Sequence, residues 1–192
     1  MTREHLPALY RAIGKPEVFA GGYGGGPEGL PPNLEAFITW AERYYAWESG
    51  NSFVIVVNGG ENDGLVIGTT TLSDFNLANE SSHLGWTAYS PAVWGTGVNP
   101  EAKLLVLGFA FDHGFGRVKL QADARNERSR AAILKLGAKF EGVLRRHKAR
   151  ADGTFRDSAM YSVLIDEWPE VRAGLQKRIA AAGPLVLDRA IV

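Results

Sequence analysis

Hydrophobic residues recur at helical spacing in two segments near the start of the chain. In the first segment, one face is formed by Leu6, Leu9, Tyr10 and Ile13. In the second, one face is formed by Leu34, Phe37, Ile38, Ala41, Tyr44 and Tyr45. The spacing predicts two helices. Gly14 and Pro16 should close the first, while Asn33 should cap the second and Gly50 should end it.

A glycine-rich run, residues 20–33, separates these two helices. Five glycines lie between Gly21 and Gly26, which predicts a loop. The run lacks the Gly-Lys-Ser/Thr signature of a phosphate-binding loop, and no strand precedes it. We therefore expect a mobile surface loop here.

The middle of the chain changes to strand patterns. Phe53–Val57 predicts a short buried strand, and Leu65–Phe75 its antiparallel partner across a glycine-rich turn. His83–Ser90 predicts a further strand. Residues 100–113 are apolar nearly all round, which indicates a helix covered on several sides.

The C-terminal part alternates strands with helices. Residues 117–124 alternate with period two, and residues 126–137 predict a short helix. Two strands, 140–150 and 155–165, flank the turn signal Asp152-Gly153, and a helix follows over 167–183. This order predicts one α+β domain over residues 1–182, with a mixed, mostly antiparallel sheet flanked by helices. Residues 183–192 form an apolar tail.

Composition narrows the classes of partner. Lys plus Arg number 21 and so do Asp plus Glu, so no net charge draws the chain to nucleic acid or anionic membranes. Zero net charge is compatible with a homodimer. The chain has no cysteine, which excludes disulfides and thiolate metal sites, and the histidines lack the spacing of metal ligands. Without a membrane-length apolar run or a signal-peptide pattern, a cytoplasmic protein is expected.

The stretch "WGTGVNPEAK" carries the first candidate chemistry. Pro100 suits the first position of a helix and Asn99 the N-cap, so Gly95 and Gly97 precede a helix N-terminus. Free N–H groups and the helix dipole favour an anion at such a place. A lone Gly-x-Gly is equally compatible with a simple turn.

Downstream residues add to this picture. Asn126 follows a strand and Ser129 lies one turn into the next helix, at the expected sheet edge of the glycine pair. Together, "LGWTAYSPAVWGTGVNPEAKLLVLGFAFD", "RVKLQADARNERSRAAILKLGAKFEGVLRRH" and "DGTFRDSAMYSVLIDEWP" resemble the GNAT family, the GCN5-related N-acetyltransferases. They look most like its RimJ/RimL-type branch. The likeness covers about half of the chain in specific motifs, and the first half in order of elements alone.

The resemblance implies transfer of an acetyl group from acetyl-CoA to a primary amine, either on a small molecule or at a protein N-terminus. It implies that the CoA pyrophosphate is held by Gly95, Thr96, Gly97, Val98 and Asn99. The pantetheine arm would run beside Ala88, Tyr89 and Ser90. Asn126 would bond the cofactor arm, besides capping its helix, and Ser129 would protonate the leaving thiolate.

The sequence departs from the family pattern at three places. Ala92 stands where the family usually has Gln or Arg, and His83 where this branch commonly has Glu. A neutral His83 can serve as the catalytic base near pH 7, and the alternative is a solvated or core-edge histidine. The strand that usually opens the family fold has no place before Leu6. It is absent, replaced by another segment such as the tail, or encoded upstream.

Other conspicuous residues are interpreted as structural. The tryptophans most often belong to the core, although Trp86 and Trp94 can line the pocket for the acyl group or the amine. A basic cluster spans residues 145–150 and predicts a solvated hairpin face. Its alternative role is to bind the 3′-phosphate of the cofactor or an acidic substrate.

Two other functions compete with N-acetyl transfer. The domain can bind CoA as a regulatory or interaction module with little catalysis, for which His83 in place of an acidic residue is the supporting feature. A nucleotide-phosphate enzyme could use the Gly-x-Gly loop, although a second glycine signature and metal ligands are missing.

Overall fold

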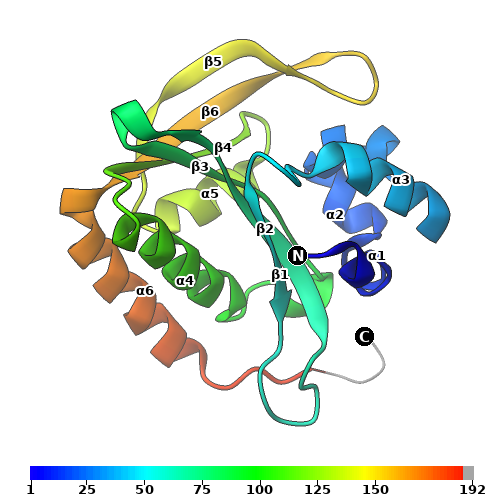
Figure 1. The fold of residues 1–192 in the computed structure, drawn as a ribbon, viewed down its shortest axis with the longest axis horizontal. Coiled ribbons are helices and arrows are strands. Elements are labelled where there is room, and N and C mark those ends of the chain that lie inside the picture. Colours follow the sequence, from blue (N-terminus) through cyan, green and yellow to red (C-terminus); the bar gives the residue numbers. More distant parts are fainter. Residues whose placement is uncertain (188–192) are drawn as a thin grey trace.

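A single mixed sheet forms the centre of the molecule. The computed structural model describes residues 1–187. Its six strands lie in the order β1-β2-β3-β4-β6-β5 (Figure 1). Their bounds are β1 Asn51–Val56, β2 Val66–Asn76, β3 Ser81–Tyr89, β4 Arg117–Asp123, β5 Lys139–Ala149 and β6 Phe155–Leu164. Neighbouring strands pair antiparallel except β3 with β4, which confirms the predicted mixed α+β fold.

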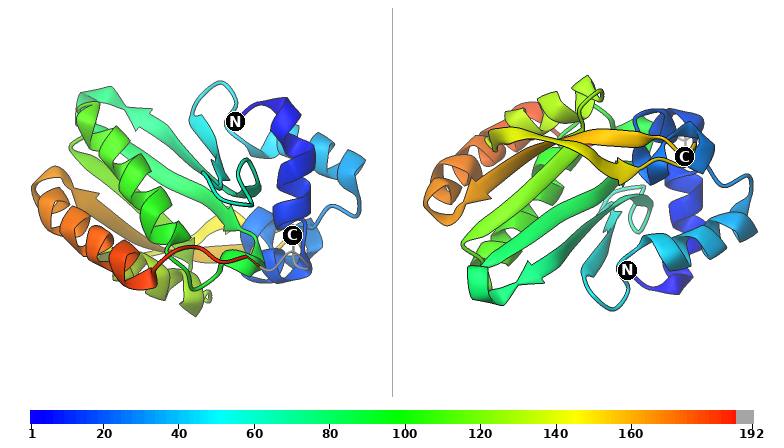
Figure 2. Two further views of the ribbon diagram at one scale, coloured as in Figure 1. Left: turned by 90° about the horizontal axis from the view of Figure 1, so that it is seen from below. Right: turned by 90° about the horizontal axis from the view of Figure 1, so that it is seen from above.

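Helices cover both faces of this sheet (Figures 1 and 2). The helices are α1 Leu6–Ile13, α2 Pro16–Ala20, α3 Leu34–Tyr44, α4 Val98–Asp112, α5 Glu127–Lys135 and α6 Trp168–Ala182. One buried cluster joins α4 and α6 to the sheet through Leu107, Tyr161 and Leu175. A second joins α1–α3 to the sheet through Leu9 and Phe37. The sheet is thus buried on both sides, as in a layered α+β domain.

The parallel neighbours β3 and β4 separate along their length. They pair at Ser81–His83 with Arg117–Lys119 and at no later residue of the described chain. Beyond this point β3 changes register against β2 between Thr69 and Thr71, opposite Trp86, whose φ is +48°. Such a bulge bends a strand and increases its twist. The two strands therefore diverge towards the start of α4.

Several predicted boundaries are wrong. Pro16 does not merely close the first helix but begins α2, because a proline is well accommodated in a first helical turn. The second predicted helix ends at Tyr44 rather than near Gly50. The strand expected to be buried, β1, is the edge of the sheet and is half-exposed. Asn33 does cap α3, accepting a hydrogen bond from the Ala36 N–H at 2.9 Å.

The two ends of the described chain lie against the first half of the sheet. No strand precedes α1 within residues 1–187, and the Met1 ammonium donates to the Ser52 carbonyl at 2.7 Å. Of the predicted tail 183–192, Leu185 and Leu187 pack against a small buried cluster, whereas residues 188–192 lie outside the described residues. No helix of the described part has both the length and the apolar character needed to cross a membrane.

Candidate functional site

A cavity of about 460 Å³ lies where β3 and β4 diverge. Its walls include the unpaired half of β3, the end of β4, the starts of α4 and α5, the Gly21–Gly25 segment and the β5–β6 hairpin. A wider depression of about 640 Å³ runs along the outside of α3 and includes none of the diverging strands. We take the first as the functional site, because polar groups from distant parts of the chain converge in it.

The glycine loop forms one end of the cavity, and Gly95 and Asn99 line it. The helix α4 begins at Val98 rather than at Pro100, so the prediction that Asn99 caps it is wrong. Thr96 explains the shift, since its hydroxyl donates to the Val93 carbonyl at 2.7 Å and accepts from the Val98 N–H at 3.3 Å. That local turn starts the helix one residue before Asn99.

The Asn99 side chain has a different partner. Its carbonyl oxygen accepts a hydrogen bond from the Tyr89 hydroxyl at 3.1 Å, which links the end of β3 to the start of α4. Pro100 occupies the third helical position, where its missing N–H has no intrahelical partner to lose. The start of α4 thus has no side chain of its own as an N-cap.

The structure gathers most of the predicted site residues in this cavity. Those that line it are His83, Ala88, Tyr89, Gly95, Asn99, Asn126 and Ser129. Those that do not line it are Ser90, Thr96, Gly97 and Val98. Ser90 donates its N–H to the Ile67 carbonyl at 2.8 Å, and Val98 packs in a buried apolar cluster.

Asn126 caps α5 as predicted. Its side-chain oxygen accepts from the Ser129 N–H at 2.9 Å, and its amide nitrogen donates to the Gly21 carbonyl. Both ends of this side chain are therefore engaged within the protein. Ser129 lies on the cavity wall, and the bond to Asn126 uses its backbone rather than its hydroxyl.

His83 is buried rather than solvated. Its side chain is 3% exposed, and its ring lies 5.3 Å from the ring of Trp86. Its Nδ1 lies 3.4 Å from Asp74 Oδ2, and within the described residues neither ring nitrogen makes a hydrogen bond of ordinary geometry. Burial lowers the pKa of His83, and this effect outweighs the opposing attraction of Asp74. The neutral imidazole is thus favoured.

Lys103 is a site residue that the sequence analysis missed. It projects from α4 into the cavity wall and is 4% exposed. Its Nζ donates to Thr87 Oγ1 at 2.7 Å and to Thr70 Oγ1 at 3.1 Å, and no carboxylate of the described chain pairs with it. Burial lowers its pKa to about 7. A single lysine in an otherwise apolar helical stretch was the available signal.

The Gly21–Gly25 segment forms the opposite end of the cavity. The expectation of a free surface loop is wrong here, because its backbone is tied to several elements. Gly24 N–H donates to the Tyr44 hydroxyl at 3.2 Å, and Gly25 accepts from the Ala151 N–H at 3.1 Å. The Tyr23 and Tyr45 hydroxyls share a 2.5 Å hydrogen bond. The loop closes over the cavity between α3 and the β5–β6 hairpin.

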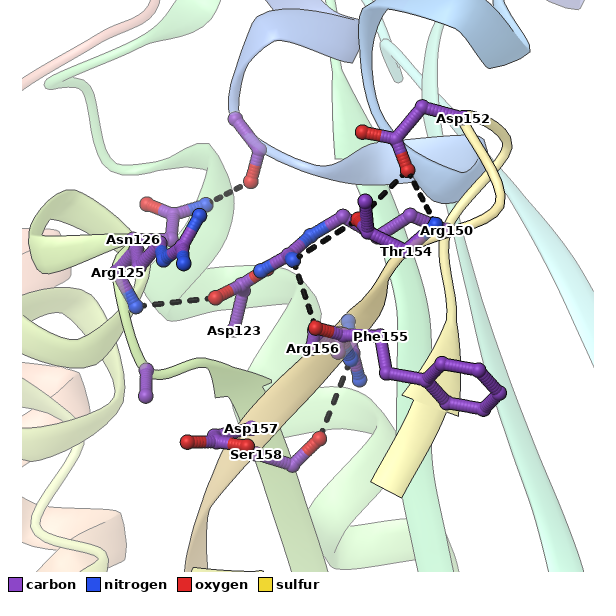
Figure 3. A network of polar contacts seen from close by, with 12 residues as sticks. Asp123, Arg125, Asn126, Arg150, Asp152, Thr154, Phe155, Arg156, Asp157 and Ser158 are labelled. Atoms are coloured by element: carbon purple, nitrogen blue, oxygen red, sulfur yellow. Dashed lines mark hydrogen bonds and ion pairs between the residues drawn. The ribbon is translucent and has the colours of Figure 1, made fainter. Parts of the chain in front are cut away.

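A polar network lies beneath this end of the cavity (Figure 3). Arg150 donates to Asp123 Oδ2 from Nε at 3.2 Å and from Nη2 at 2.6 Å. Burial raises the pKa of Asp123, but the Arg125 N–H and the Arg150 guanidinium outweigh burial and hold it below its usual range. Arg156 donates from Nε to Ser158 at 3.2 Å.

The basic cluster predicted as one solvated hairpin face divides into two parts. Arg145 and Arg146 are exposed and do not line the cavity, whereas Lys148 and Arg150 do. The difference follows from the irregular pairing of β5 with β6, whose register shifts between Leu144 and Lys148. Within the described chain, no group of three or more His, Asp or Glu side chains is placed to hold a metal ion.

Comparison with known proteins gives the same picture of the fold. Residues 1–139 match the family model described as an acetyltransferase (GNAT) domain. A protein from T. thermophilus, solved as an acetyltransferase, is 35% identical, with 93% of this chain and 90% of that chain covered and a TM-score of 0.80. A GCN5-related N-acetyltransferase from Brucella melitensis is 25% identical, with 99% and 83% covered and a TM-score of 0.79.

Mycobacterium smegmatis RimJ shares the fold at 19% identity, with 95% of this chain and 87% of that chain covered and a TM-score of 0.72. A search of curated proteins returned no match. The family model includes the first half of the chain, where sequence motifs alone had indicated little beyond the order of elements.

Proposed function

The chain belongs to the GNAT acetyltransferase family, and from this premise we propose that it transfers an acetyl group from acetyl-CoA to a primary amine. One observation carries the proposal. The glycine loop at the start of α4, the unpaired half of β3 and the buried His83 all line the same cavity. An anion site, an open strand edge and a proton acceptor are what acetyl transfer between a thioester and an amine requires.

The proposed orientation of acetyl-CoA follows from the two ends of the cavity. Its pyrophosphate is assigned to the Gly95–Asn99 segment, where backbone N–H groups and the dipole of α4 attract anions. Its pantetheine arm is assigned to Ala88–Ser90, along the half of β3 that β4 does not pair. Both Gly95, with φ +79°, and the absence of neighbours around its would-be Cβ support close approach of a phosphate.

We assign the proton acceptor to His83. The amine nitrogen attacks the thioester carbonyl and passes a proton to the neutral imidazole, and the C–S bond then breaks to give the amide and a CoA thiolate. Ser129 is assigned the proton that the thiolate takes up. Burial already favours the unprotonated imidazole, which suits a general base near neutral pH.

Lys103 is the competing candidate for the base, and a pH profile separates the two. With His83 as base, kcat/KM rises with pH through a value below 6.5, because burial lowers the pKa of that ring. With Lys103 as base, the rise is centred near 7. His83→Gln should abolish the lower limb and reduce turnover by about 100-fold, within the range typical of general-base catalysis.

The first test is ligand binding. Acetyl-CoA should raise the apparent Tm of the protein, whereas ATP and NAD at equal concentration should not, since a ligand of the folded state stabilises it by mass action. An acetyl-CoA consumption screen over amine classes then tests transfer. No shift with saturating acetyl-CoA would contradict the proposed function.

The alternative is a CoA-binding regulatory or interaction module. It is favoured by the burial of His83 without a hydrogen-bonded orienting partner among the described residues. It predicts an acetyl-CoA shift in Tm with no CoA release for any amine, and no change in either measurement on His83→Gln substitution.

Three finer assignments complete the proposal. We place the chain in the RimJ/RimL-type branch, supported by the motifs around Gly95 and Asn126 and by the fold shared with M. smegmatis RimJ, which was solved with CoA-disulfide. That branch makes a protein N-terminus one acceptor to test, beside small amines. A cytoplasmic location and a homodimer are also proposed, and size-exclusion chromatography with light scattering tests the latter.

A further inference from the structure

We propose that the amine acceptor of this protein carries a carboxylate, and that Arg156 binds that carboxylate at the hairpin end of the cavity. The inference rests on the proposed acetyl transfer and specifies its acceptor. It comes from the charge distribution and the hydrogen bonding of the cavity wall, and it concerns the acceptor end, away from the glycine loop.

Arg156 has donors to spare. It lines the cavity half-buried, and its Nε donates to Ser158 Oγ at 3.2 Å. Within residues 1–187 its two Nη atoms make no hydrogen bond. Burial lowers the pKa of Arg156, although a guanidinium keeps its charge in proteins. A partly desolvated cation with free N–H groups is a strong site for a carboxylate, which it can bind through two parallel hydrogen bonds.

The neighbouring Arg150 does not offer such a site. Its Nε and Nη2 bind Asp123 Oδ2, and its Nη1 donates to the Phe155 carbonyl at 2.9 Å and approaches Thr154 Oγ1 at 3.4 Å. Arg150 therefore ties the end of β4 to the hairpin, as Figure 3 shows. The structure distinguishes an engaged arginine from an available one.

Protein carboxylates do not meet the needs of Arg156. Among the described residues that line the cavity, Asp123 is the single acidic one. Its Oδ2 is taken by Arg150 and its Oδ1 accepts the Arg125 N–H at 3.0 Å. The basic residues of the lining are Lys103, Arg128, Lys148, Arg150 and Arg156. This imbalance leaves room for an added negative charge.

The pairing of the hairpin strands points the same way. Lys148 lies directly across from Arg156 in the β5–β6 register, and like charges in that position repel each other. Tyr44 also lines this end, and burial raises its pKa to about 12, so its hydroxyl keeps its proton. A carboxylate here would relieve the repulsion and could accept from this hydroxyl as well.

The phosphates of the cofactor are assigned to a different place. The glycine loop follows β3, whereas Arg156 lies on β6, which is on the far side of β4. At the loop end of the cavity lies Arg128, whose guanidinium is 3.7 Å over the ring of Trp94. Arg156 therefore belongs to the acceptor side.

Matched acceptors test the proposal in the wild-type protein. Each α-amino acid is compared with its carboxamide and with its decarboxylated amine, with kcat/KM measured from CoA release. We expect the best amino acid to exceed its carboxamide by about 10-fold or more, the effect of a charge-assisted hydrogen bond. Equal kcat/KM for the acid and the amide would overturn the inference, and so would acetylation of amines without any carboxylate-bearing substrate.

Variants then assign the preference to one residue. Arg156→Met should lower kcat/KM for the acid by about 10-fold, mainly through KM, and change it little for the carboxamide. Arg156→Lys should restore part of the loss. Arg145→Met is the matched control on the same hairpin, since Arg145 is exposed and lies outside the cavity. An unchanged preference for the acid in Arg156→Met would overturn the assignment.

Acetyl-CoA affinity separates the failure of this inference from the failure of the proposed function. If acetyl-CoA does not raise the Tm of the wild-type protein, acetyl transfer itself is wrong. If acetyl-CoA binds equally to wild type and Arg156→Met, and neutral amines are acetylated as well as acids, the carboxylate site alone is wrong. The comparison of acid with amide needs no variant, so it holds even where Arg156→Met fails to fold.

Discussion

The two ends of the cavity are built in different ways. The cofactor end comes from one continuous stretch, in which β3 runs into the glycine loop and then into α4. The acceptor end is assembled from the Gly21–Gly25 segment, α3 and the β5–β6 hairpin, which lie far apart in sequence. Local backbone rules shape the first end, and contacts between distant segments shape the second.

Glycine has a different use at each end. At Gly95 an added Cβ would meet no atom within 4 Å, so the glycine keeps space open. At Gly24 an added Cβ would lie 2.5 Å from the Phe19 ring, so the glycine lets the chain pack closely. A run of glycines therefore does not by itself reveal a ligand site. The following predictions test this contrast, beginning with the largest effect.

Lys103 should control the pH dependence of stability at the cofactor end. Its pKa is lowered from 10.5 to about 7 in the folded protein, so the unfolded chain binds more protons between these values. Stability should therefore rise with pH across this window, by up to about 1.4 kcal/mol per pH unit. Lys103→Met should remove that rise, and be more stable than wild type by about 3–5 kcal/mol near pH 6.5.

Urea unfolding at several pH values between about 6 and 10 measures this difference. Thr70 and Thr87 share a 2.8 Å hydrogen bond, so their hydroxyls keep a partner in the variant. Parallel stability profiles for wild type and Lys103→Met would show that the lysine is not buried as described.

Asp123 should matter most for the assembly of the acceptor end. Asp123→Asn leaves Arg150 with a weakened partner in a largely buried pair and should cost about 2–4 kcal/mol. The pKa of Asp123 is held below its usual range, so this stabilisation is present above about pH 4 and lost as pH falls through the folded pKa. Thermal unfolding near pH 7 and near pH 3 checks both statements.

The exposed pair Arg117–Glu141 provides the control for Asp123. Its side chains are 37% and 33% exposed, and Glu141→Gln should cost less than about 1 kcal/mol because water screens the pair. Equal losses for the two substitutions would mean that the Asp123–Arg150 pair does not hold the hairpin more strongly than a surface pair does.

Gly95 should affect acetyl-CoA binding more than stability. Gly95→Ala places a Cβ at a residue with φ +79°, which costs about 1 kcal/mol, and narrows the proposed phosphate site. Acetyl-CoA affinity should fall by about 10-fold. Gly114→Ala is the matched control, since Gly114 has φ +85° and open space around its Cβ, but lies beyond the other end of α4.

Isothermal calorimetry and thermal unfolding on the two glycine variants separate the effects. Both should lose similar stability, and Gly114→Ala should bind acetyl-CoA as wild type does. Equal affinities in both variants would remove the glycine loop from the proposed cofactor site.

Asn126 joins the two ends, and its variants should produce the smallest change. Asn126→Asp keeps the oxygen that caps α5 but loses the donor to the Gly21 carbonyl, so its stability should stay within about 0.5 kcal/mol of wild type. Asn126→Ala loses both contacts and should cost about 1 kcal/mol. Amide hydrogen exchange at Gly22 and Gly24 should quicken in both variants. Unchanged exchange in Asn126→Asp would show that the loop does not depend on this contact.

Prediction from sequence succeeded where neighbouring residues decide the structure. The caps at Asn33 and Asn126, the alternation over β4 and the turn at Asp152-Gly153 all follow from chain-local geometry. The error at Asn99 was also local. Two cap signals competed, and the Thr96 hydroxyl started the helix earlier than the asparagine would have done.

Prediction was weaker where burial depends on distant partners. His83 stands at the start of a strand in sequence, yet β3 is an inner strand of the sheet, so the ring is covered. Lys103 was passed over in an apolar helix, because nothing local shows that Thr70 and Thr87 receive its ammonium. Arg150 and Arg156 look alike in sequence, and their hydrogen bonds alone separate them.

By itself, the sequence determined the order of helices and strands, the glycine-helix junction at Gly95 and the resemblance to the acetyltransferase family, since each depends on residues close together in the chain. Tertiary structure decided the cavity, because β3 and β4 diverge only as parts of one sheet. It also decided which buried charges are satisfied and which face the cavity. Desolvation and hydrogen bonding are set by atoms that meet in space, whatever their separation along the chain.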